Sequence, residues 1–110
     1  MPEAERKAKD RREYQLKLRR DPLYNAKRKA RLYGLTHLQV EAILSKQGGG
    51  CALCGSTKLL RIDHCHKTGV VRGVLCQKHN AALGLAGDDL AGVVRLLNYL
   101  LRVQNERDNH

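Results

Sequence analysis

The residues best suited to chemistry are an acid, two histidines and an amide that lie close together in the sequence. Asp63, His64 and His66 end one hydrophobic segment, and Asn80 follows a second one. Carboxylate and amide oxygens are ligands that Mg²⁺ or Mn²⁺ takes when waters and a phosphate fill its other positions. A histidine beside them can deprotonate a water near neutral pH. The pattern therefore indicates metal-assisted attack on a phosphodiester.

A second set of residues has the spacing of a zinc site. Cys51 and Cys54 form a CxxC pair, and Cys76 and His79 repeat that spacing later in the chain. Two such pairs complete a tetrahedral shell with no position left for water, so we expect a structural zinc ion. A segment as short as residues 51–85, which these ligands would hold together, seldom folds without a metal or a crosslink. An all-cysteine shell with Cys65 in place of His79 stays open, although Cys65 has no partner at this spacing.

The composition favours a polyanionic partner. The chain has 110 residues, which is enough for one small domain and an arm, and its net charge is +10 with neither Trp nor Phe. Most of this charge lies before Gly34, in a segment with 12 basic and 5 acidic residues. Phosphate contacts release counterions, so nucleic acid is the expected partner of such a segment. The alternative is a basic helix that is only solvated.

The N-terminal residues and the apolar segments indicate the cellular compartment in which the protein is expected. Residues 1–20 are charged throughout and lack the apolar stretch of a secretory signal. The longest strongly apolar run, residues 96–101, is far shorter than the roughly 20 residues of a membrane span. We therefore expect a cytoplasmic protein without a membrane partner, in which the cysteines bind metal and form no disulfides.

Capping residues predict two helices before the first cysteine pair. Asp21 caps a basic helix that begins with a proline and ends near Gly34. Thr36 opens a capping box for a second helix, which ends at three consecutive glycines. We therefore divide the chain into a basic helical arm over residues 1–34 and a metal-binding domain over residues 35–110.

The candidate catalytic residues fall on a predicted hairpin and on the helix after it. Two hydrophobic segments, 59–62 and 70–75, flank a Lys-Thr-Gly turn and predict two antiparallel strands. A short helix is expected directly after the second strand. A last, amphipathic helix is expected from Asp88 or Asp89 to about Arg107.

The segment from about Arg28 to Asp88 resembles the recombination endonuclease VII family. This family is a branch of the ββα-metal, or His-Me finger, HNH-like nucleases, and it is found largely in bacteriophages. The likeness rests on the stretches RLYGLTHLQVEAILSKQGGGCALCG, IDHCHKTGVVRG and LCQKHNAALG. The family usually has cysteine where this chain has His79, and histidine is an equally acceptable zinc ligand.

The resemblance implies a role for each of the four candidate catalytic residues. His64 would be the general base, and Asp63 and Asn80 would hold the catalytic Mg²⁺ or Mn²⁺. His66 would touch the phosphate or the waters of the metal. The substrate would be branched or Holliday-junction DNA, cut in the host cytoplasm if a phage encodes the protein, with 5′-phosphate and 3′-hydroxyl ends on the products.

The expected fold class is α+β: a small zinc-stapled ββα-metal endonuclease core, flanked by basic N-terminal helices and an amphipathic C-terminal helix. Cations near the hairpin are candidate phosphate ligands: Arg61, Lys67, Arg72 and Lys78. The C-terminal helix carries more aliphatic residues than such a core can cover, so we expect a homodimer joined through it. Two rival functions stay open: an HNH-type nicking or homing endonuclease acting on duplex DNA, and a non-catalytic zinc module that binds nucleic acid.

Overall fold

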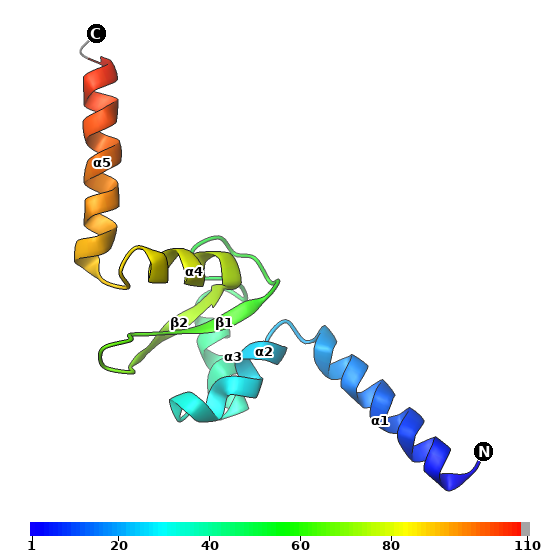
Figure 1. The fold of residues 1–110 in the computed structure, drawn as a ribbon. Helices are drawn as coiled ribbons and strands as arrows, with labels where there is room; N and C mark the ends of the chain where they lie inside the picture. The colour runs from blue at the N-terminus through cyan, green and yellow to red at the C-terminus, as the bar shows by residue number, and fades with distance from the viewer. Residues whose placement is uncertain (109–110) are drawn as a thin grey trace.

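A computed structural model describes residues 1–108 of the chain. Its helices and strands are Glu3–Arg20 (α1), Tyr24–Lys29 (α2), the 3₁₀ turn Ala30–Tyr33 (η1), His37–Lys46 (α3), Leu60–His64 (β1), Val71–Cys76 (β2), Gln77–Leu85 (α4) and Leu90–Asp108 (α5). The predicted α+β class is confirmed. The strands and α2 to α4 form a central body, from which α1 and α5 project in different directions (Figure 1). The molecule therefore measures 76 × 31 × 23 Å along its principal axes.

The two strands form the predicted antiparallel hairpin. The register pairs Leu60 with Cys76 at the open end, and Gly69 turns the chain at the closed end with a φ of 74°. The pairing is irregular between Asp63 and His64. Such a bulge bends the strand and re-aims the side chains beside it. It falls at the residue predicted to be the general base.

The core is small and aliphatic. The largest fully buried side chains are Leu60, Val40 and Val74, from β1, α3 and β2. The segment around α2 adds three more buried residues, which are Leu23, Ala26 and Ala30. Because α2 packs against β1, the second half of the basic segment belongs to the same core as the hairpin. The division of the chain at residue 34 stays a prediction.

The predicted helix caps are present at α3 and α5. Thr36 Oγ1 accepts a hydrogen bond from the Gln39 backbone at 3.1 Å, and Gln39 Oε1 accepts one from the Thr36 backbone at 2.8 Å. This reciprocal pair is the predicted capping box. At α5, Asp89 Oδ1 accepts a hydrogen bond from the Gly92 backbone at 2.8 Å. Asp88, the other candidate cap, has a φ of 61° and makes different contacts, described below.

Helix α5 leaves the body at a tight corner and exposes most of its apolar side chains. A Cβ on Gly92 would lie 1.7 Å from the carbonyl oxygen of Ala86, so this corner requires glycine. The exposed large apolar residues of α5 are Leu90, Val93, Val94, Leu96, Leu97, Tyr99, Leu100 and Leu101. Within residues 1–108, the apolar stretches of the helices are too short or too charged to cross a membrane.

Candidate active site and metal centre

A turn, a strand end and a helix start bring four metal-ligating side chains together. The ligand atoms of Cys51, Cys54, Cys76 and His79 all lie within 4.8 Å of one another. Cys54 Sγ lies 3.8 Å from Cys76 Sγ, and His79 Nδ1 lies 3.2 Å from Cys76 Sγ and 3.9 Å from Cys51 Sγ. A tetrahedron with Zn–S bonds of about 2.3 Å has edges of about 3.8 Å. The predicted cluster therefore fits a zinc ion and could hold one.

The backbone around the first cysteine pair prepares it for a metal. A Cβ on Gly50 would collide with the backbone of Gly55, the residue directly after the CxxC turn, so the close approach here requires glycine. Burial opposes ionisation of the Cys51 thiol, but the backbone N–H groups of Cys76, Cys54 and Leu53 outweigh it and lower the pKa of Cys51 to about 6. The thiolate is the form of cysteine that binds metal, so this environment favours a ligand.

Cys65 lies outside this cluster. It stands in the hairpin turn, where its N–H donates to Val70 at 2.8 Å and its carbonyl oxygen accepts from Gly69 at 2.7 Å. The four cysteines are all free thiols. The geometry therefore favours the predicted set of three cysteines and His79 over the all-cysteine alternative.

The predicted base and the predicted amide ligand line one cavity. A hollow of about 80 Å³ lies between α2 and β1, and His64 and Asn80 both reach its surface. The His64 ring packs against the Tyr33 ring, with centroids 4.6 Å apart, and against the His66 ring at 4.8 Å. The other residues that line the hollow are Asn25, Ala26, Lys29, Arg61 and Ile62. The predicted base, two amides and two cations therefore share one small space, and the two cations make it positively charged.

Asp63 is not among the residues that line this cavity, and its carboxylate is bound by Arg72. Arg72 Nε donates to Asp63 Oδ2 at 2.9 Å, and Arg72 Nη2 donates to Asp63 Oδ1 at 2.8 Å. Asp63 is only 6% exposed. Each carboxylate oxygen has two acceptor positions, so this pairing leaves one free on each. The structure therefore leaves acceptor positions on Asp63 but does not place this residue in the cavity with Asn80, the other predicted ligand.

The same guanidinium joins the end of β1 to the corner before α5. Arg72 Nη1 donates to the Asp88 carbonyl oxygen at 3.2 Å, and Nη2 contacts the His64 carbonyl oxygen at 3.1 Å and the Asp88 carboxylate. The His66 backbone N–H donates to Asp88 Oδ2 at 2.9 Å. The His66 N–H and the Arg72 guanidinium hold the pKa of Asp88 below its usual range. Arg72 and Asp88 thus position the segment that carries the predicted base.

The predicted phosphate ligands lie in different surroundings. Arg61 lines the cavity with His64, and Lys78 lines a hollow beside the cysteine cluster. The Lys67 side chain is 80% exposed at the hairpin turn. Arg72 uses its donors on carboxylate and carbonyl oxygens, which indicates a positioning role. For the other three, contact with DNA stays a prediction.

Replacing Arg72 with alanine should destabilise the protein, because it leaves the buried Asp63 carboxylate without its partner. We expect the free energy of unfolding to fall by about 1–3 kcal/mol, measured by urea denaturation of the zinc-loaded protein. Lys67→Ala removes a nearby exposed cation and should change the free energy of unfolding by less than about 0.5 kcal/mol. Equal effects of the two substitutions would contradict the positioning role of Arg72.

Comparisons with known proteins place most of the chain in one family. A family model described as recombination endonuclease VII matches residues 26–102. A relative called "Gene 59 protein" from Mycobacterium phage D29 is 44% identical over 73 residues, which cover 62% of this chain and 44% of the relative. The protein of the same name from Mycobacterium phage L5 is 43% identical over 74 residues, which cover 63% and 45%.

The chain therefore spans less than half the length of these curated relatives. No solved structure matches it. The family match contains both cysteine pairs, His64 and Asn80, and Arg72 with the residues that it contacts. On this evidence the chain belongs to the recombination endonuclease VII family.

Proposed function

We propose that the protein is a Mg²⁺- or Mn²⁺-dependent endonuclease that hydrolyses phosphodiester bonds of branched or Holliday-junction DNA. The observation that carries this proposal is the shared cavity of His64 and Asn80, flanked by Lys29 and Arg61, in a chain of the recombination endonuclease VII family. By likeness to its phage relatives, we further propose that it acts in the cytoplasm of an infected host cell.

His64 takes a proton from the attacking water in this proposal. Its ring packs against the rings of Tyr33 and His66, and these contacts help to orient the imidazole before the reaction. Lys29 and Arg61 hold the phosphate beside it as charged donors. His66, exposed at the edge of the same segment, is an auxiliary contact to the phosphate or to water.

Asp63 and Asn80 are the proposed ligands of the catalytic cation. Both offer hard oxygen atoms, and Arg72 fixes the orientation of the Asp63 carboxylate. A cation held there would supply positive charge beside the phosphate and the leaving 3′ oxygen. Separately, we propose that Cys51, Cys54, Cys76 and His79 hold a structural zinc ion that joins the CxxC turn to β2 and α4.

We also propose a homodimer joined through α5. The apolar side chains of this helix are exposed in the single chain, and a two-fold dimer would cover them and present two copies of His64 to two DNA strands. Sedimentation at micromolar concentration should give the mass of two chains. Replacing Leu97 and Leu101 by aspartate should give the mass of one chain, whereas Arg102→Asp, at an exposed position on the opposite side of the same helix, should not. A wild-type monomer that cuts junctions at full rate would favour a nicking enzyme.

A panel of DNA substrates tests the proposed function. A four-way junction, a flap, a nicked duplex and a linear duplex of the same sequence are each incubated with the zinc-loaded protein and Mg²⁺ or Mn²⁺. We expect the junction to be cut fastest. Equal rates on the linear duplex would favour the HNH-type nicking enzyme. Tight binding without cleavage of any substrate would favour the non-catalytic zinc module.

A further inference from the structure

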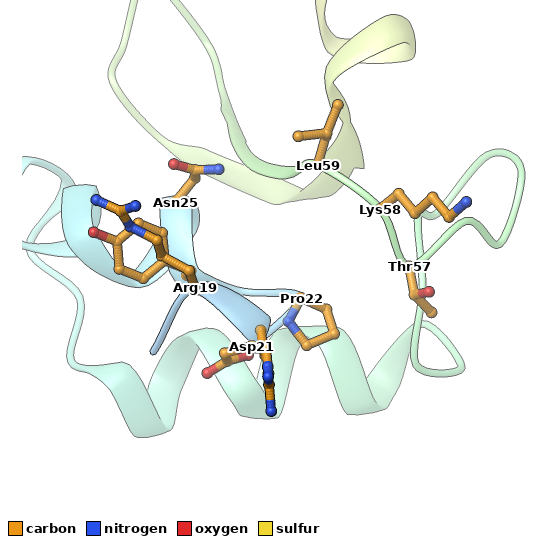
Figure 2. A pocket seen from close by; sticks show the side chains of 9 residues that line it. Arg19, Asp21, Pro22, Asn25, Thr57, Lys58 and Leu59 are labelled. Atoms are coloured by element: carbon orange, nitrogen blue, oxygen red, sulfur yellow. The ribbon is translucent and has the colours of Figure 1, made fainter. Parts of the chain in front are cut away.

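A larger hollow lies beside the beginning of β1 (Figure 2), and His64 is not among the residues that line it. It has a volume of about 460 Å³ and lies between the junction of α1 and α2 and the segment that leads into β1. Pro22 and Asn25 stand on one side of it, and Thr57, Lys58 and Leu59 stand on the other (Figure 2). Two parts of the chain that are distant in sequence therefore form its walls.

The hollow is strongly basic. Its lining includes Arg19, Arg20 and Lys58, and within residues 1–108 these three form no ion pair. The lining carboxylate, Asp21, is already engaged, because its oxygens accept hydrogen bonds from Lys27 Nζ at 2.6 Å and from a backbone N–H at 2.9 Å. The charge left for a ligand is therefore positive.

This basic hollow shares one lining residue with the cavity of the candidate active site. Asn25 lines both spaces, and it stands on α2, which packs against β1. Strand β1 begins beside the hollow and ends at His64 in the cavity. It is five residues long, which is about 13 Å between its terminal residues. That distance corresponds to at most about four nucleotides of one strand, at an axial rise of 3.4 Å per nucleotide in a DNA duplex. Cations line both spaces, with Lys29 and Arg61 in the cavity of His64 and the other three in the hollow.

We propose that the basic hollow binds the phosphate backbone of the DNA strand that is cut at His64, a few nucleotides to one side of the scissile phosphate. Backbone contacts by arginine and lysine fix the register of a nucleic acid without reading its sequence. Leu59 adds an apolar side chain, 57% exposed, that can contact a sugar at the edge of the hollow. This inference rests on the proposed nuclease function and names the surface that aligns its substrate.

The test compares two triple variants that remove the same charge. One carries Arg19→Gln, Arg20→Gln and Lys58→Gln in the hollow. The control carries Lys9→Gln, Arg11→Gln and Arg12→Gln, at least seven residues or about 10 Å earlier along α1. Binding of a four-way junction is measured without Mg²⁺ at several salt concentrations. We expect the slope of log affinity against log salt to shrink by about 2–3 for the first variant and by less than about 1 for the control.

A position-specific readout locates the contact on the DNA. Single phosphates of the junction are replaced by neutral methylphosphonates, which should weaken binding of the wild type and the control at two or three positions on one side of the cut. The hollow variant should show no loss at those positions. The variant with Arg19→Lys and Arg20→Lys keeps the charge and should behave like the wild type.

The outcomes separate this inference from the proposed function. Equal slopes for the two triple variants, or an unchanged methylphosphonate pattern, would overturn the role of the hollow even if the wild type cuts DNA. A larger loss for the hollow variant supports the binding surface. If that loss is found but the wild type cuts no DNA, the nuclease proposal fails and the hollow remains a DNA-binding site.

Discussion

The His64→Ala variant should lose about 10²-fold or more in cleavage rate while keeping its fold, its zinc content and its affinity for DNA. A general base acts on the proton that moves in the transition state, so its removal affects the chemical step more than binding. His64 is half-buried at the surface of a cavity, and its ring packs on one side against Tyr33. Truncation there removes no part of the buried aliphatic core.

Single-turnover cleavage at saturating junction DNA measures this loss, because it separates chemistry from binding and product release. His37→Ala is the matched control, since that histidine is exposed on α3 and outside the small cavity. We expect the control to cut at the wild-type rate. A His64→Ala protein that does the same would remove His64 from the mechanism.

The Cys76→Ser variant should lose zinc and, with it, the folded core. Cys76 is buried at the end of β2 and pairs with Leu60 in the hairpin, so it joins the metal cluster to the core. Structural zinc sites contribute about 10–16 kcal/mol of apparent binding free energy at neutral pH, which exceeds the total stability of most small domains. Metal analysis and thermal melting followed by circular dichroism measure both losses.

Two further substitutions define the ligand set. Cys65→Ser should keep one zinc per chain and an unchanged melting temperature, because Cys65 lies outside the cluster. His79→Cys should also keep the ion, since cysteine and histidine both bind zinc. Loss of zinc in Cys65→Ser would restore the all-cysteine alternative. An unchanged melting temperature in Cys76→Ser would show that the core folds without the metal.

Features that depend on neighbouring residues could be predicted from the sequence. The capping box of Thr36 and Gln39 lies within one helical turn, and the hairpin follows from two hydrophobic segments beside a glycine turn. The cysteine cluster was predictable for a different reason. The CxxC and CxxH pairs each form a local turn, and the hairpin that joins them was itself predictable.

Features that depend on tertiary packing could not be predicted. Lys29 and Asn25 reach the cavity because α2 packs against β1, and no local pattern of the basic segment indicates that contact. Arg72 has the sequence context of a phosphate ligand, and the fold instead places it against two carboxylates. From the sequence, Asp88 is as good a candidate as Asp89 for the cap of α5. Its contact with the His66 backbone joins residues 22 positions apart, which no local pattern indicates.

Hydrolysis of DNA is tested most directly by adding Mg²⁺ to the zinc-loaded full chain already bound to an end-labelled four-way junction. We expect strand cuts that accumulate with time, that require the divalent cation, and that leave 5′-phosphate and 3′-hydroxyl ends. A protein that binds the junction with its zinc in place, yet leaves every strand intact with both Mg²⁺ and Mn²⁺, would contradict the assignment of this cavity as an endonuclease active site.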